Sequence, residues 1–70
     1  MKINGANIPD ADNRGRSFPF MEGGPHFAGP CIVNGTLMVI KAWENTTADG
    51  RIYLRYVFEN PDQCPNLVEE

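Results

Sequence analysis

Hydrophobic and polar positions alternate strictly in one segment of the chain, residues 51–59. The even-numbered positions are Ile52, Leu54, Tyr56 and Phe58, and the odd-numbered positions are Arg51, Tyr53, Arg55, Val57 and Glu59. Successive side chains of a β-strand point to opposite faces of the sheet, so this alternation predicts a half-buried strand. We expect its even-numbered face to be buried and its odd-numbered face to be solvated.

Residues 36–44 show no such alternation, because both faces of a strand built from them would be apolar. Met38, Ile40 and Ala42 would share one face, and Leu37, Val39 and Trp43 would share the other. A strand that is apolar on both sides is expected at the centre of a sheet. Its second face then needs cover, either from another segment of the chain or from another subunit.

Turn residues separate these apolar segments. Asn34-Gly35 follows a short apolar run and indicates a two-residue type I′ hairpin turn, which needs a positive φ at both central positions. Asp49-Gly50 closes the next loop. The pattern therefore predicts a three-stranded antiparallel meander at about 30–33, 36–44 and 51–59.

The pairing between the last two predicted strands has two solutions. If Glu44 lies opposite Arg51, the odd-numbered apolar residues of 36–44 join the apolar face of 51–59. If Asp49-Gly50 contributes a bulge, the pairing shifts by one residue and the even-numbered ones join it instead. The opposite charges of Glu44 and Arg51, worth roughly 0.2–1 kcal/mol as a cross-strand pair, favour the first register.

The remaining segments contain many residues that disrupt regular structure. Residues 1–30 contain Pro9, Pro19, Pro25 and Pro30, and proline excludes a long helix there. Apolar side chains are nevertheless spread along this segment, so we expect an irregular arm packed on the sheet, with a short strand near Ile3 or 18–20. Residues 60–70 form a short tail. The prediction is one small, mainly β domain with little or no helix, comprising arm (1–30), meander (31–59) and tail (60–70).

Composition restricts the class of protein. The chain has 70 residues and a net charge of −3. This charge is neither the basic excess of a general nucleic-acid binder nor the high negative charge of a protein that mimics DNA. No apolar run approaches the roughly 20 residues of a membrane-spanning helix, and the opening residues 1–5 show none of the apolar run typical of a secretory signal. We therefore expect a cytoplasmic protein without membrane association. Cys31 and Cys64 permit a single bridge, but we interpret both as reduced thiols.

Few groups in the chain suit catalysis or metal binding. His26 is the only histidine and is interpreted as an ordinary loop residue. The segment that begins Asp10-Ala11-Asp12 resembles the start of a calcium loop, but it lacks the required oxygen ligands at the fifth and twelfth positions. Neither cysteine has a visible base partner. We expect no catalytic residues, no metal, no cofactor and no enzymatic activity.

Basic and aromatic side chains provide a candidate binding site. Exposed aromatic residues beside arginines are the means by which some sheets stack nucleic-acid bases, and glycine-rich loops with arginines can bind anions. The candidate set is Arg14, Arg16, Lys41, Trp43, Arg51, Tyr53 and Arg55. The alternative interpretation is that these residues simply form a solvated face.

Three functional hypotheses follow. The first is a small non-enzymatic binding protein that acts through a surface as a homo-oligomer, in the role of an inhibitor or modulator of a larger host protein. Its basis is the excess of apolar and aromatic residues over what so small a chain can bury. The second is a binder of a nucleotide or oligonucleotide through Arg14, Arg16, Arg51, Arg55 and Tyr53. The third is a structural subunit of a larger assembly, whose arm becomes ordered only on its neighbour.

Overall fold

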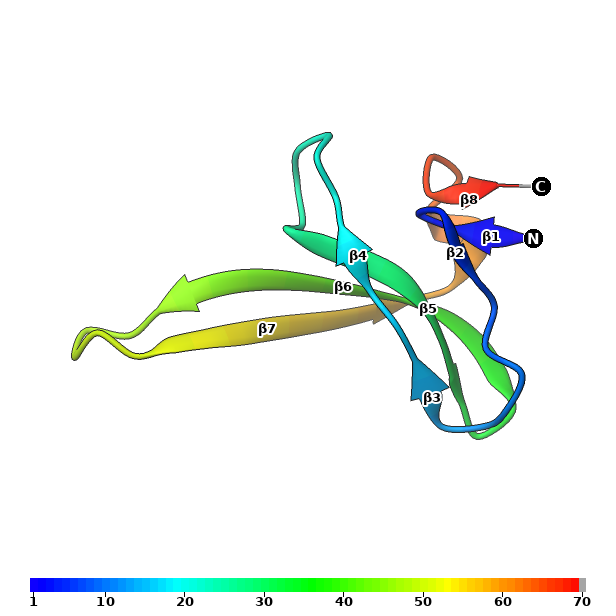
Figure 1. The fold of residues 1–70 in the computed structure, drawn as a ribbon, viewed down its shortest axis with the longest axis horizontal. Coiled ribbons are helices and arrows are strands. Elements are labelled where there is room, and N and C mark those ends of the chain that lie inside the picture. Colours follow the sequence, from blue (N-terminus) through cyan, green and yellow to red (C-terminus); the bar gives the residue numbers. More distant parts are fainter. Residues whose placement is uncertain (70) are drawn as a thin grey trace.

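The protein is mainly β, with antiparallel sheets, as predicted (Figure 1). The computed structural model describes residues 1–69. Its elements are β1 (Lys2–Ile3), β2 (Ala6–Asn7), β3 (Arg14–Gly15), β4 (Phe18–Pro19), β5 (Phe27–Val33), β6 (Thr36–Thr46), β7 (Ile52–Glu59), the 3-10 helix η1 (Pro61–Gln63) and β8 (Val68–Glu69). Within the described residues there is no α-helix.

The main sheet has the strand order β3-β5-β6-β7, and β4 also pairs with β5 beyond the end of β3. The predicted strands at 30–33, 36–44 and 51–59 overlap β5, β6 and β7, but they do not form a separate three-stranded sheet. β6 extends two residues further than predicted and β7 begins one residue later. The β6–β7 hairpin projects away from the rest of the chain, as Figure 1 shows.

β5 begins at Phe27, so the predicted boundary at residue 30 is wrong. Pro30 is tolerated inside the strand because its backbone groups face β3 and β4. Its carbonyl accepts a hydrogen bond from the Arg16 N–H at 3.1 Å. In an antiparallel strand the nitrogen of a residue points to the same side as its carbonyl. The Pro30 nitrogen, which carries no hydrogen, therefore points to the gap between β3 and β4.

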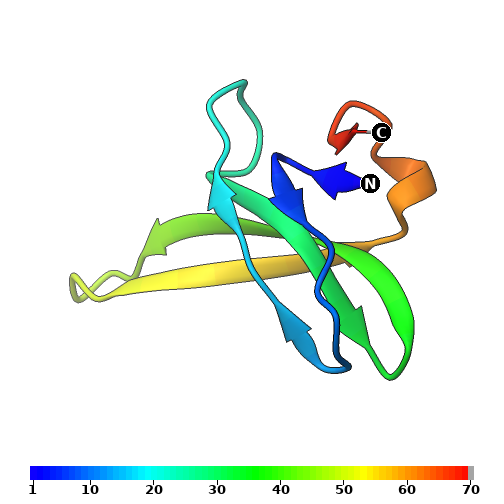
Figure 2. The same cartoon turned by 45° about the vertical axis from the view of Figure 1, so that its right-hand side comes forward.

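Residues 1–30 contain four short strands in addition to the start of β5, so the predicted irregular arm is also incorrect in part. β1 pairs with β2 and with β8, which gives a second sheet of order β2-β1-β8. This small sheet lies against the main sheet, near β5 (Figure 2). The buried core between them comprises Ile3, Ala28, Val39, Cys64 and Leu67, with Ile8, Phe20, Leu37 and Val68 packed against it.

The register between β6 and β7 differs from the favoured prediction. Glu44 lies opposite Leu54, and Arg51 is in the loop beside Asp49 instead of opposite Glu44. The shift relative to the favoured register is three residues. Because three is an odd number, it exchanges the faces, so the even-numbered residues of β6 share a face with the even-numbered residues of β7.

Candidate interaction surface

The two faces of the main sheet differ in how they are covered. Directly opposed residues of an antiparallel pair lie on the same face. One face, here called the covered face, contains Ala28, Val39 and Lys41 and packs against the small sheet. The other, the open face, carries Cys31 and Val33 of β5, Met38 and Ile40 of β6, and Ile52, Leu54, Tyr56 and Phe58 of β7.

The open face is mostly apolar and largely exposed, and its one charged residue on β6 is Glu44, opposite Leu54. Five of its large side chains, Val33, Ile52, Leu54, Tyr56 and Phe58, have exposed fractions between 40% and 69%. Val39, on the covered face, is 0% exposed. The contrast arises because β1, β2 and β8 pack on one side of the sheet only. The even-numbered face of β7, predicted to be buried, is therefore the face that is exposed.

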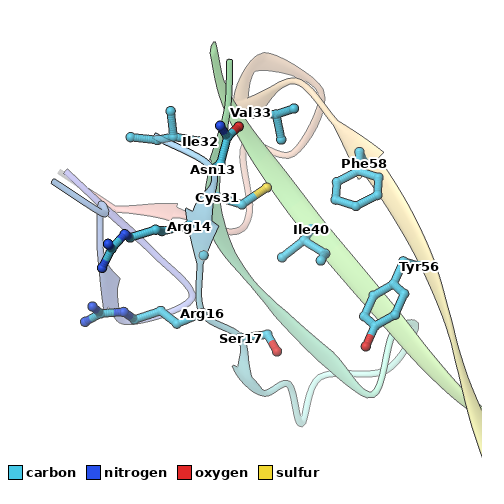
Figure 3. A pocket seen from close by; sticks show the side chains of 11 residues that line it. Asn13, Arg14, Arg16, Ser17, Cys31, Ile32, Val33, Ile40, Tyr56 and Phe58 are labelled. Atoms are coloured by element: carbon cyan, nitrogen blue, oxygen red, sulfur yellow. The ribbon is translucent and has the colours of Figure 1, made fainter. Parts of the chain in front are cut away.

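A groove of about 480 Å³ lies at the β3 side of the open face (Figure 3). The side chains of Cys31, Ile40, Tyr56 and Phe58 line it, and residues 13–17 form its other wall. This wall comes close to β5 because Gly29 has no side chain. A Cβ at Gly29 would lie 2.0 Å from the carbonyl oxygen of Arg16.

The groove contains little that could carry out chemistry. Arg14 and Arg16 contribute to its wall, but Figure 3 shows their side chains pointing away from Ile40 and Tyr56. Burial raises the pKa of the Cys31 thiol. The thiol therefore stays protonated at neutral pH and is a weak nucleophile. The groove is suited to receive an apolar side chain.

A basic and aromatic row lies on the same side of the sheet as the covered face and runs along the β6–β7 hairpin. The guanidinium of Arg55 lies 4.6 Å from the centre of the Trp43 ring, and Tyr53 follows on the same face of β7. Lys41 Nζ lies 2.6 Å from Glu59 Oε1. The hydrogen bond to Glu59 raises the pKa of Lys41, so this amine is engaged within the chain.

The seven candidate binding residues occupy three places. Lys41, Trp43, Tyr53 and Arg55 form the row on the hairpin. Arg51 lies in the loop, with its Nε 3.4 Å from Asp49 Oδ2. Arg14 and Arg16 lie at the opposite edge of the sheet, three strand spacings from β7, or about 14 Å. The structure therefore brings only four of the seven together.

The residues of the open face were absent from the predicted site. The sequence contains their signal, since residues 36–44 are apolar on both faces and one of these faces had no assigned cover. The strict alternation in 51–59 predicts that the even-numbered face is buried, because a half-buried strand is the common case. The small sheet covers the opposite face of the main sheet, and this choice of face depends on contacts between residues that are distant in the sequence.

The two cysteines are free and lie on opposite sides of the main sheet. Cys31 lies on the open face and Cys64 in the core beneath the covered face, so they do not form the bridge that the sequence had left open. His26 has a structural role: its Nδ1 accepts a hydrogen bond from the Glu44 N–H at 2.8 Å. This contact joins the residue before β5 to β6.

The described part of the chain has no group of three His, Cys, Asp or Glu side chains arranged to hold a metal ion. Residues 1–69 likewise include no helix of the length and hydrophobicity needed to cross a membrane. Comparison with models of protein families, with curated proteins and with solved structures finds no match for this chain. The surface is therefore the basis for a functional argument.

Proposed function

We propose that this chain is a small, non-enzymatic binding protein that acts through its open face and associates with itself. The observation that supports the proposal is the group of five large apolar side chains, 40–69% exposed, on one face of one sheet. Half-exposed aromatic side chains such as Tyr56 and Phe58 each leave about 100 Å² uncovered. Contiguous apolar areas of a few hundred Å² on small proteins typically mark interaction sites.

The shape of the surface supports a protein partner over a small molecule. The open face extends over three strands, and the groove beside it receives side chains from β5, β6 and β7. A projecting hairpin with an apolar face can insert into or cover a site on a larger protein, which is how an inhibitor or modulator would act. Two buried, unpaired thiols are in keeping with a reducing, cytoplasmic setting.

Self-association is tested by light scattering and sedimentation from low to high micromolar concentration. The wild type should form oligomers, and Leu54→Asp, on the open face, should weaken association at least tenfold. Tyr53→Asp is the matched control, since Tyr53 is the next residue of the same strand, is 46% exposed and lies on the other face. A wild type that stays monomeric at high micromolar concentration would rule out self-association.

A second candidate function is stacking of a nucleotide or oligonucleotide base on the hairpin row. It is favoured by the Arg55 guanidinium over Trp43 and by the exposed ring of Tyr53 beside them. The site would be smaller than the sequence predicts, because Arg14 and Arg16 lie at the other edge. Titration with short single strands should give an affinity that Arg55→Ala reduces and Arg16→Ala does not. Equal affinities for both variants would exclude this site.

The third hypothesis, a structural subunit of a larger assembly, receives less support. It requires residues 1–30 to become ordered only on a neighbouring subunit. Here Ile3 and Ala6 of this segment are buried within the chain itself, and β1 pairs with β8.

A further inference from the structure

β7 lies at the free edge of the main sheet, because it pairs with β6 on one side and with no other described strand (Figure 1). It is eight residues long and contains neither proline nor glycine. Edge strands of soluble proteins are usually short, bulged, covered or interrupted by proline, since an exposed edge pairs readily with another strand. β7 has none of these protections.

The direction of the backbone groups at this edge follows from the loop that precedes β7. The Thr47 N–H donates to the Arg51 carbonyl at 2.8 Å, and these two residues continue the register in which Thr46 opposes Ile52. Hydrogen-bonded and non-hydrogen-bonded pairs alternate along an antiparallel ladder. The odd-numbered residues of β7 therefore bond to β6, and the even-numbered ones direct their N–H and C=O groups to the free edge.

The geometry points to a second copy of this chain as the strand that pairs with this edge, with the two β7 strands antiparallel and Val57 opposite the partner's Val57. This inference rests on the proposed self-association and specifies how it occurs. The two-fold axis is perpendicular to the sheet. The main sheets of the two copies then form one continuous sheet, and their open faces lie side by side on the same surface.

Charge selects this register from its neighbours. Four registers bond the outward groups and pair at least five of the eight residues of β7: those with Leu54, Arg55, Tyr56 or Val57 opposite its own counterpart. The first leaves Arg55 opposite the partner's Tyr53. The second places two arginines directly opposite each other, which is destabilising. The third leaves Arg55 opposite the partner's Val57.

The register with Val57 opposite its counterpart places Arg55 opposite the partner's Glu59, and the symmetry produces this ion pair twice. Glu59 Oε1 binds Lys41 of its own chain, so the carboxylate would bind two cations. This register also pairs Tyr56 with the partner's Phe58 on the open face, again twice. Pairing ends before Asn60, whose N–H donates to Gln63 Oε1 at 3.1 Å and whose carbonyl accepts from the Gln63 N–H at 3.0 Å, so it runs from Arg55 to Glu59.

The position of Val57 supplies the main experiment. Its backbone groups face β6, so across the new edge the two Val57 residues form a non-hydrogen-bonded pair with Cα atoms about 4.5 Å apart. This distance permits a disulfide. Val57→Cys should therefore give a disulfide-linked dimer under mild oxidation, seen on a non-reducing gel and by mass spectrometry.

The native cysteines make a clean background, since Cys31 and Cys64 are both buried. Tyr53→Cys is the matched control, because four residues separate it from the two-fold axis and it should not cross-link to its counterpart.

A charge exchange tests the same register without a new cysteine. Arg55→Glu should weaken the dimer about tenfold or more, and the double variant Arg55→Glu, Glu59→Arg should recover much of the lost affinity. Circular dichroism confirms that each variant is folded. Efficient cross-linking through Tyr56→Cys in place of Val57→Cys would overturn the register.

Two further outcomes separate this inference from the proposed function. A dimer in solution that cross-links at neither Val57→Cys nor Tyr56→Cys, and that charge exchange does not affect, would overturn edge pairing while leaving self-association through the open face. A wild type that is monomeric at high micromolar concentration would overturn both.

Discussion

Gly29 shows how a single residue determines the architecture of the open face. It lies in the middle of β5, where glycine usually weakens a strand. Here the chain at Arg16 and Ser17 passes directly over it, and a Cβ would lie 2.0 Å from the Arg16 oxygen and 2.8 Å from the Ser17 Cα. Both atoms belong to the backbone, so a side chain at position 29 cannot be accommodated by rotation of a neighbour.

Gly29→Ala should therefore destabilise the protein by about 3 kcal/mol, at the upper end of the cost of overpacking. In a domain of this size such a loss lowers the Tm by more than 10 °C. Thermal unfolding followed by circular dichroism measures it. Gly23→Ala is the control: Gly23 has open space around it and a φ of 91°, so only backbone strain of about 1–2 kcal/mol is expected. Equal Tm values for the two variants would contradict the close approach at Gly29.

The same position shows why β5 was only partly predictable from the sequence. Gly29-Pro30 is typical of a break in a strand, and the sequence accordingly predicts an irregular arm before the sheet. Both residues are compatible with β5 because of their neighbours: Pro30 has no hydrogen-bond partner to lose at the interruption between β3 and β4, and Gly29 gives space to residues 16–17. These neighbours lie more than ten residues away in the sequence.

At the scale of elements, the two turns that flank β6 differ in how far the sequence predicts them. The Asn34-Gly35 turn has the positive φ values that its sequence predicts, 48° and 81°. The turn after β6 is longer, and its own hydrogen bonds determine it. The Thr47 carbonyl accepts from the Gly50 N–H at 3.0 Å, and the Thr47 hydroxyl accepts from the Arg51 N–H at 3.0 Å.

These bonds place Arg51 in the loop, where it cannot oppose Glu44. A cross-strand charge pair contributes a fraction of a kcal/mol, less than two hydrogen bonds at about 1 kcal/mol each. The register favoured by the sequence depends on the charge pair, whereas the observed register depends on the side chain of Thr47. Because residues 36–44 are apolar on both faces, the hydrophobic pattern did not correct the error.

A pair of engineered disulfides tests the register. Glu44 and Leu54 are directly opposed and form a non-hydrogen-bonded pair, whose Cα atoms are about 4.5 Å apart. Glu44→Cys with Leu54→Cys should oxidise to an intramolecular disulfide, identified by mass spectrometry after digestion. Glu44→Cys with Arg51→Cys, the pair from the favoured sequence register, should remain reduced under the same conditions. The reverse result would mean that the charge pair, and not the Thr47 turn, aligns the hairpin.

At the scale of the whole molecule, the chain is a sheet with a core on one side. Ile3, Leu67 and Cys64 close the covered face, and among the described residues no element packs on the projecting end of the open face. The chain measures 40 Å in its longest dimension and 17 Å in its shortest. So thin a molecule cannot bury both faces of its sheet. The covered face therefore carries the core, the open face is the one proposed to bind, and substitutions on the two faces should affect stability differently.

Two valines provide a matched comparison of these faces. Val39 is fully buried on the covered face, and Val33 is 41% exposed on the open face. Replacement of valine by threonine preserves the shape of the side chain but adds a hydroxyl group. In Val39→Thr this group has no water to bond, so unfolding by urea should show a loss of about 1–3 kcal/mol. In Val33→Thr the hydroxyl reaches solvent, so the change should stay within about 0.5 kcal/mol. If Val33→Thr destabilised the monomer as much as Val39→Thr, the open face would be part of the core and would not be free to bind a partner.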